Sequence, residues 1–340
     1  MVVVTTVSRQ PTIWIALWTV YILWGSTYLG IELVGETVPG IYAAGVRFTI
    51  AGALLLGFIA WRKGRAVLRL TRAQLLSSAI VGLLLPGANS LLFITEREVP
   101  IGLASLIIAS VPLWVVLLRL AVGERPELVS TAGLVVGFAG IALLVRPGGG
   151  SGSLGFLFLT VLAAILWAVG SFLSPRLQLP GDALVATGFE MAIGGLFLLA
   201  LGLLTTSPAD LDPSTYSARS IFGLWYLIVF GSLLGYSAYV WLLANAPIGQ
   251  VSTYAYVNPV VAIILGAIVL GESITLRIVA GALLILASVA IVVRRESAAA
   301  VAAEGPPAVG GATDEPLETD DLVRADGDAR ELPSRGVAQR

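Results

Sequence analysis

Cysteine and histidine are both absent from the 340 residues of this chain, and only 12% of the residues are charged. Without Cys or His the chain has no disulfide, no thiol or imidazole nucleophile, and no zinc site built on those ligands. Soluble domains carry about 25% charged residues, whereas here 57% are hydrophobic and the mean hydropathy is +0.93. The composition therefore predicts a membrane protein without a cofactor or metal and argues against an enzyme.

The net charge of −1 hides two regions of opposite sign. From residue 296 to the end, ten acidic residues stand against four Arg, so the rest of the chain is mildly basic. This last segment is rich in Ala, Gly, Pro and acids, and it has too few large apolar residues to bury a core. We expect residues 296–340 to be a disordered acidic tail without a role in transport, and we expect no nucleic-acid partner.

Apolar stretches that can cross a membrane occur ten times. A hydrocarbon layer of about 30 Å takes about 20 helical residues. The ten stretches are residues 13–33, 40–61, 74–94, 101–122, 129–145, 154–173, 183–204, 221–243, 251–270 and 278–293. Backbone groups in lipid must bond within their own segment, and the alternating pattern of a β-barrel is missing. The fold class expected is therefore an all-α integral membrane protein with ten transmembrane helices.

Lys and Arg are distributed unevenly between the two sets of loops. If the N-terminus is cytoplasmic, eleven lie near the cytoplasmic ends of the spans and four near the opposite ends, with five of the eleven in residues 62–72. The positive side of such a pattern is normally cytoplasmic. We therefore expect a multi-pass plasma (inner) membrane protein of a prokaryote with both termini in the cytoplasm.

The two halves of the chain repeat one another. Residues 99–102 (VPIG) match residues 246–249 (APIG) at an offset of 147. Further equivalent pairs at this or a similar offset are Pro112 with Pro259, Trp24 with Trp167, and Arg47 with Glu190. Each unit has five spans, and since five is odd the second unit must enter the membrane from the other side. This predicts two inverted five-helix repeats, residues 13–146 and 154–295.

Carriers with inverted repeats bind their substrate near the midplane, where helices are interrupted. Because proline removes a helical hydrogen bond, Pro112 and Pro259 are the expected helix breaks. Polar and aromatic side chains near these points are candidates for a substrate cavity: Trp24, Asn89, Ser90, Trp114, Trp167, Tyr236, Tyr239, Tyr254 and Asn258. Ordinary helix packing is the competing interpretation for Trp24 and Trp167.

Two charged residues lie deep in the spans. Arg47 and Glu190 are each the eighth residue of a span of 22 residues, which places them at mirror-related depths. A charge in the membrane is costly unless it is paired or hydrated. The two residues are therefore candidates for coupling, in which Glu190 takes up a proton and frees Arg47 for an anionic substrate. A static ion pair between them is the alternative.

Other motifs favour structural roles. Gly133 and Gly137, and likewise Gly231 and Gly235, have the spacing that lets helices approach closely, with packing inside the protein as the default over a homodimer, which stays open. The acids in the pairs at 123–124 and 271–272 are expected to pair with Arg125 or to cap the following helix.

Several of these motifs together resemble a known family. The first unit has PIGLASL at 100–106, PLW at 112–114 and GERP at 123–126, and the second has YVNPV at 256–260 and LGES at 270–273. This pattern resembles the EamA-type repeat of the drug/metabolite transporter superfamily, over about residues 13–295. The resemblance implies a small-molecule carrier, most often an exporter of metabolites, amino acids or drugs. Glu190 departs from the neutral residue expected at its position.

A secondary transporter of a small organic solute, driven by a proton or substrate gradient, is the function expected from these features. There is no GxxxxGK[ST] nucleotide-binding motif and no long soluble domain, which excludes ATP hydrolysis by this chain. The expected partners are the small-molecule substrate and the lipid bilayer. Two alternatives remain: a flippase for lipid-linked metabolites, which needs a lateral gap to lipid, and a membrane-embedded enzyme, for which the acids are poorly placed.

Overall fold

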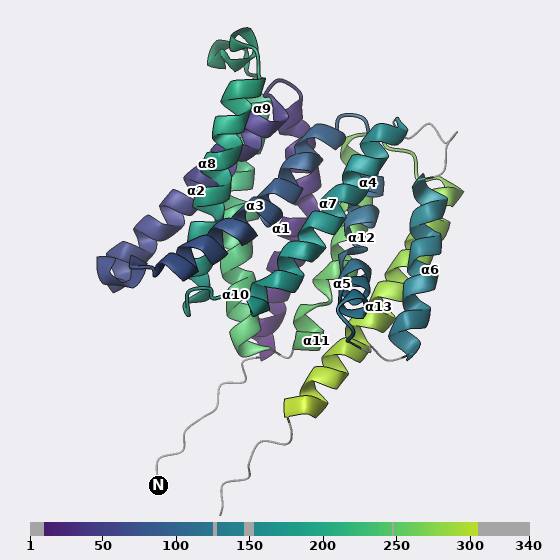
Figure 1. The fold of residues 1–340 in the computed structure, drawn as a ribbon. Coiled ribbons are helices and arrows are strands. Elements are labelled where there is room, and N and C mark those ends of the chain that lie inside the picture. Colours follow the sequence, from purple (N-terminus) through teal and green to yellow (C-terminus); the bar gives the residue numbers. More distant parts are fainter. Residues whose placement is uncertain (1–9, 125–127, 146–152, 247, 305–340) are drawn as a thin grey trace, which may run out of the picture. The chain divides into compact units, whose positions relative to one another are not determined.

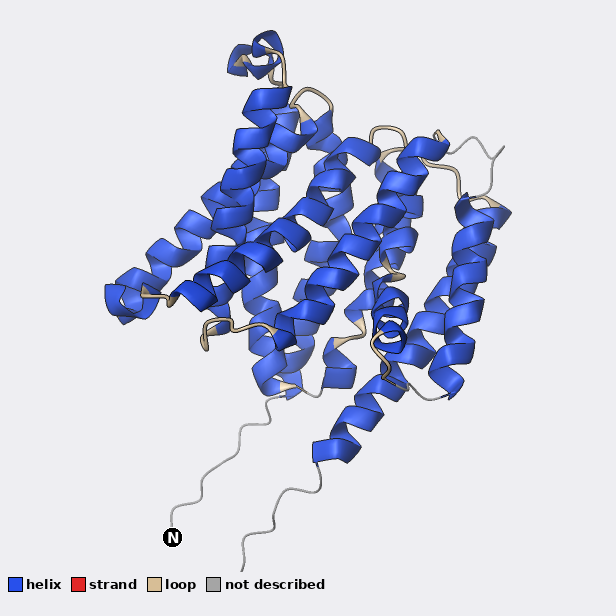
Figure 2. Ribbon diagram, in the orientation of Figure 1, coloured by secondary structure: helices blue, strands red, loops and turns tan. Residues whose placement is uncertain are grey.

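Helices in the computed structural model follow the apolar stretches of the sequence. The structure describes residues 10–124, 128–145, 153–246 and 248–304, of which 248–249 and 296–304 are described by their backbone alone. These residues form helices joined by turns, without a strand among them (Figure 2). The predicted all-α fold class is confirmed.

The helices divide into two sets of corresponding elements. The first set consists of α1 (Gln10–Gly35), α2 (Gly40–Lys63), α3 (Arg72–Thr95), α4 (Ile101–Ile108), α5 (Val111–Ala121) and α6 (Leu128–Val145). The second consists of α7 (Leu154–Leu173), α8 (Ala183–Thr205), α9 (Ala218–Tyr226), the π-helix η5 (Leu227–Leu234), α10 (Gly235–Asn245), α11 (Ile248–Val251), α12 (Tyr254–Val269) and α13 (Leu276–Glu304). Figure 1 shows that α1 and α7, the first helices of the two repeats, run in opposite directions.

Nine helical segments of the described residues are long and apolar enough to cross a membrane, and Tyr254–Val269 is a shorter apolar helix. Together they correspond to the ten predicted spans. Three of the nine join consecutive elements: Leu154–Arg176 adds the short 3-10 helix Ser174–Arg176 to α7, Ile101–Ala121 contains α4 and α5, and Ala218–Asn245 contains α9, η5 and α10. We call the last two the composite spans. The composite spans line the cavity described below.

The helix breaks differ from the prediction in one of the two repeats. In the first repeat the interruption lies at Ala109 and Ser110, and Pro112 stands in the first turn of α5. In the second repeat it lies at Ser252 and Thr253, whereas Pro259 stands inside the continuous helix α12. The expectation that Pro259 breaks its helix is therefore wrong. A proline inside a helix is tolerated in membranes because neighbouring helices can satisfy the freed backbone groups.

Glycines bring the equivalent helices α2 and α8 into backbone contact. A Cβ atom added to Gly202 would lie 2.6 Å from Cα of Tyr42, and one added to Gly52 would lie 2.5 Å from the backbone nitrogen of Ala192. Without a hydrophobic force between helices in lipid, small residues stabilise such contacts by close packing. The second helices of the two repeats thus form a tight interface between the halves.

The described residues up to Val301 form one compact unit. The helix α13 continues to Glu304, so the prediction of disorder is wrong for residues 296–304. The remainder of the predicted tail, residues 305–340, lies outside the described residues. All side chains of the site described next belong to this compact unit.

Candidate functional site

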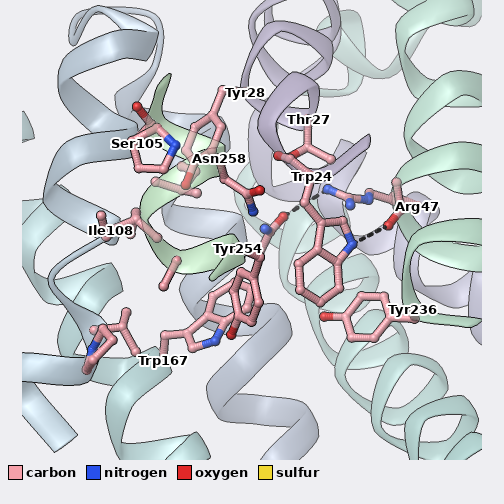
Figure 3. Close-up of a pocket in the computed structure, with 18 of the residues that line it drawn as sticks. Trp24, Thr27, Tyr28, Arg47, Ser105, Ile108, Trp167, Tyr236, Tyr254 and Asn258 are labelled. Atoms are coloured by element: carbon pink, nitrogen blue, oxygen red, sulfur yellow. Dashed lines mark hydrogen bonds between the residues drawn. The ribbon is translucent and has the colours of Figure 1, made fainter. Parts of the chain in front are cut away.

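A cavity of about 110 Å³ lies between the two repeats, where the composite spans meet. It is lined by side chains of both repeats, ten of which are labelled in Figure 3. Residues named from the sequence that line it are Trp24, Arg47, Asn89, Pro112, Trp167, Tyr236, Tyr254, Asn258 and Pro259. Water needs about 10–15 Å³ of such space per molecule, so the cavity has room for several waters or for part of a solute.

A second cavity of about 360 Å³ shares Pro112, Trp167 and Tyr254 with the first. It extends along α5 to Arg119 and also contacts Tyr239 and Ser252. Arg119 lies in the last turn of α5, near the face of the membrane where α5 ends. The hollow space therefore continues from the centre of the protein toward this face.

Two predicted cavity residues lie outside both of these cavities. Ser90 donates to the backbone carbonyl of Gly87 at 2.7 Å, within its own helix. The Trp114 indole donates to Ser110 Oγ at 3.1 Å and packs edge-on against Phe138, with the ring centroids 4.6 Å apart. The contacts recorded for both side chains lie within the first repeat.

Arg47 is the charged residue of the cavity wall. Its side chain is 3% exposed, and it donates from Nε to Ser232 Oγ at 3.1 Å and from Nη1 to Asn89 Oδ1 at 3.0 Å. Its guanidinium also lies 4.8 Å from the centre of the Phe48 ring. These hydrogen-bond partners are neutral, so they orient the guanidinium without cancelling its charge.

The predicted ion pair between Arg47 and Glu190 is not observed among the described residues. Arg47 turns toward Asn89 on α3 and Ser232 in η5. Glu190 lies on α8 where that helix crosses α3 at Gly82. Equal depth in the membrane was the basis of the prediction, but depth leaves the rotation of each helix undetermined, and rotation decides which side chains meet.

Aromatic rings form a second part of the wall. The Trp24 indole donates to the carbonyl of Gly231 at 3.2 Å, and its ring centre lies 5.1–5.3 Å from those of Tyr236, Tyr239 and Tyr254. Edge-on aromatic contacts of this kind are stabilising and hold the rings in place. Figure 3 shows Trp24 and Tyr236 on the same side of the cavity as Arg47, and Trp167 and Ile108 on the other.

Asn258 supplies an unused polar group. Its side chain is 9% exposed, and its Oδ1 atom has no hydrogen-bond partner. A buried polar atom without a partner costs about 1–3 kcal/mol. A bound solute or water that donates to Oδ1 would remove this cost.

The sequence did not predict a cavity position for ten of the residues that line the first cavity, among them Thr27, Tyr28, Ser105 and Gly231. It also missed Ser232, which orients Arg47. Thr27 and Tyr28 lie one turn beyond Trp24 on α1, so helical spacing from Trp24 was a signal that could have found them. Ser232 reaches Arg47 from the π-helix η5. Such π segments are rare, occur often at functional sites, and have no simple sequence signature.

The glutamates of the two glycine-glutamate pairs have partners that the sequence did not predict. Glu124 forms ion pairs with Arg119 and Arg176, each at 2.5 Å, while Arg125 lies outside the described residues. Glu272 accepts from the backbone N–H groups of Ile101 and Gly102, and so caps α4 of the other repeat instead of the helix that follows it. Neither the pair at 123–124 nor the pair at 271–272 indicates by itself which residues of the other repeat its glutamate contacts.

This arrangement is suited to binding, because it combines one cation, one unused acceptor and an aromatic wall. Within the described part of the chain, no group of three Asp or Glu residues could hold a metal ion. The site thus offers hydrogen bonds, charge and apolar surface to a solute held between the two repeats.

Comparison with known proteins gives consistent results. The model of the EamA-like transporter family matches residues 12–146 and again residues 154–294. The chain is 35% identical over 262 residues to "Uncharacterized inner membrane transporter YedA" of Escherichia coli K12, covering 76% of this chain and 83% of that protein. It is 29% identical over 286 residues to "Uncharacterized transporter YvbV" of Bacillus subtilis, covering 84% and 92%.

A solved crystal structure, described only as "Crystal structure of protein", has the same fold. It aligns with a TM-score of 0.58 at 19% sequence identity and covers 83% of this chain and 97% of its own.

Proposed function

Because the chain belongs to the EamA-like transporter family, we propose that it is a secondary transporter that exports a small organic solute with an anionic group and an apolar or aromatic body. Relatives named as transporters support the coarse function. The composition of the cavity supports the class of solute, and the position of the second cavity supports the direction.

The charge on Arg47 is the observation that carries the proposal. A buried cation in the membrane needs a counter-charge or water, and the recorded hydrogen-bond partners of Arg47 are the neutral groups of Asn89 and Ser232. A carboxylate or similar anion of the solute would supply the counter-charge and accept charge-assisted hydrogen bonds. The rings of Trp24, Tyr236 and Tyr254 would contact the rest of the solute.

The proposed direction rests on which face the cavity approaches. The second cavity extends to Arg119, near the ends of spans that the distribution of Lys and Arg assigns to the cytoplasm. A solute could then enter from the cytoplasm in this conformation and leave after the repeats rearrange. The driving force would be a proton gradient or the gradient of the solute itself.

Counterflow into proteoliposomes tests this proposal. Labelled solutes would be offered in matched pairs, each an aromatic carboxylate and its neutral amide, with and without an imposed pH gradient. We expect exchange of carboxylates and little exchange of the amides. Equal exchange of both forms, or exchange of neither by folded protein, would contradict the proposed solute class. A response to the pH gradient would identify the proton as the driving ion.

A further inference from the structure

Glu272 joins the two repeats at one end of the interface between them. It follows α12 in the second repeat, and its carboxylate accepts from Ile101 N at 2.6 Å and Gly102 N at 3.2 Å, the first residues of α4 in the first repeat. The first N–H groups of a helix lack partners within the helix and favour a negative charge. Glu272 therefore holds the end of α12 to the start of α4.

Two glycines, Gly266 and Gly102, pack closely against the carboxylate of Glu272. A Cβ atom added to Gly266 of α12 would lie 2.5 Å from Glu272 Oε2, and one added to Gly102 of α4 would lie 3.5 Å from it. Gly271, with φ +70°, provides the left-handed turn that directs Glu272 toward α4. A substitution at Gly266 would thus displace the carboxylate without changing it.

The equivalent carboxylate of the first repeat makes no such cap. Gly123 has φ +84° and forms the same turn, but Glu124 pairs with Arg119 and Arg176. The second cavity reaches Arg119 on that side. We call the two ends of the interface the Glu272 face and the Glu124 face. In this structure Glu272 connects α12 to α4 at the Glu272 face, and the hollow space extends toward the Glu124 face.

A second buried carboxyl lies at the Glu272 face. Glu96, directly after α3, is 4% exposed, and neither of its side-chain oxygens has a hydrogen-bond partner. Oε2 of Glu32 on α1 also has no hydrogen-bond partner. The charged and titratable groups that act on Glu96 are Glu32 and Tyr28 of α1, Glu272, and Arg47 of α2. The adjacent Arg97 donates to the carbonyl of Gly35 at the end of α1.

Burial raises the pKa of Glu96, and the nearby carboxylates of Glu32 and Glu272 raise it further, while Arg47 lowers it. A protonated carboxyl is tolerated in such a place, whereas a third negative charge beside two others is not. No group of three acids among the described residues suits a metal ion. The proton is therefore the cation that fits Glu96.

We propose that Glu96 is a proton-binding site and that Glu272 is the latch it controls: the Glu272 face stays closed while Glu96 carries a proton and opens when the proton is lost. Loss of the proton leaves ionised Glu96 near Glu32 and Glu272, and opening lets water hydrate these charges. Closure thus takes up one proton, and opening releases it to the Glu272 face. This inference rests on the proposed function, because it assumes that the two repeats expose the site alternately.

The sign of the pH dependence follows from this linkage. The proton-binding group has a higher pKa in the closed form than in the hydrated open form, so low pH favours the closed form. Raising the pH above the raised pKa favours opening at the Glu272 face. The same proton would connect the latch to the solute site, since Arg47 acts on both.

Access to a single cysteine tests the proposal, because the chain has no Cys of its own. Ser105 of α4 is fully buried, lines the cavity, and is converted to cysteine. A membrane-impermeant maleimide is added only at the Glu272 face of sealed vesicles. The labelling rate is divided by the rate for the denatured protein at the same pH, which removes the titration of the thiol itself. We expect labelling to be slow at pH 6 and to rise with pH.

Three variants separate the roles of the two carboxyls. Glu272→Gln should label about tenfold faster at low pH, because it loses hydrogen bonds to a charged acceptor. Gly266→Ala should act in the same way by displacing Glu272, which covers the case that Glu272→Gln fails to fold. Glu96→Gln mimics the protonated acid, so its labelling should stay slow at every pH.

Matched controls decide between outcomes. Gly57→Ala, whose added Cβ would meet no atom within 4 Å, should label like the unmodified background. Glu190→Gln should keep the pH dependence. Unchanged labelling in both Glu272→Gln and Gly266→Ala would overturn the latch, and a pH dependence retained in Glu96→Gln would overturn the proton site. Labelling needs no substrate, so a failed solute assay would leave this result standing.

Discussion

Arg47 is a buried cation, and the hydrogen-bond partners recorded for its side chain are neutral. The side chains of Asn89 and Ser232 hold the guanidinium in one orientation from two other helices. Preorganised donors of this kind favour a planar anion such as a carboxylate over a neutral group. The contact to Phe48 covers one face of the guanidinium and leaves its hydrogen-bonding edge for polar partners.

Replacing Arg47 with Ala should lower affinity for an anionic solute by about tenfold to a hundredfold, because hydrogen bonds to a charged group contribute about 1.5–3 kcal/mol each. The apparent KM for counterflow measures the change, with gel filtration as a check of folding. Arg65→Ala, an exposed position, is the control and should transport normally. An unchanged KM in Arg47→Ala would place the anion elsewhere.

Replacing Asn258 with Leu should have opposite effects on stability and binding. Leucine has a similar shape and removes the unpartnered Oδ1 atom, so the empty protein should gain about 1 kcal/mol of unfolding free energy. Solute affinity should fall because an acceptor in the cavity is lost. Thermal unfolding in detergent and counterflow measure the two quantities. If stability rises and affinity is unaffected, Asn258 has no contact with the solute.

At the scale of elements, the composite spans do most to form the site. The break between α4 and α5, the turn before α12 and the π-helix η5 each bring backbone or short polar side chains to the interface between the repeats. Trp24 reaches the carbonyl of Gly231 in η5, and a Cβ atom added to Gly235 would lie 2.5 Å from its indole nitrogen. The missing side chains of Gly231 and Gly235 thus leave room for α1 to pack closely against η5 and α10.

Gly235→Ala should therefore force Trp24 out of position and lower stability by about 1–3 kcal/mol, the usual effect of overpacking. The thermal midpoint in detergent measures this effect. Gly87→Ala in α3 is the matched control, since its added Cβ would meet no atom within 4 Å, and it should be neutral or slightly stabilising. Equal midpoints for the two variants would show that α1 and α10 can separate without cost.

How much the sequence predicted depends on the kind of contact. The length of the apolar stretches predicted the transmembrane helices. The matching motifs predicted that Pro112 is equivalent to Pro259 and Trp24 to Trp167. Helix rotation could not be derived in this way, which is why the pair of Arg47 with Glu190 was wrong. The cap of Glu272 on α4 joins segments about 170 residues apart, and the role of Ser232 depends on a π-helix. Both features are set by tertiary packing.

At the scale of the whole molecule, the two repeats meet along α2 and α8, and Arg47 and Phe48 of α2 also line the cavity. The tight glycine packing of these helices gives the halves a fixed point of contact. Rearrangement about such a contact would change the ends of the composite spans more than the centre. The latch at Glu272 lies at one of these ends.

The predicted orientation can be tested with two single cysteines. A cysteine in place of Arg65 should react with an impermeant thiol reagent only from the cytoplasm, and one in place of Asp210 only from the other side, because eleven of fifteen Lys and Arg near the span ends lie on the first side. Intact cells and inverted vesicles give the two measurements. Reaction of both cysteines from one side would contradict the inverted arrangement.

The different partners of Glu124 and Glu272 also affect which conformation is populated at rest. Two identical copies related by a two-fold axis would have two states that the same rotation interconverts, with equal free energy, and the protein would be found in each half of the time. Every residue at which the copies differ removes this degeneracy, and about 1.4 kcal/mol is enough for a tenfold bias. The resting orientation of the transporter is thus encoded in the positions at which the two repeats differ, the contacts of Glu124 and Glu272 among them.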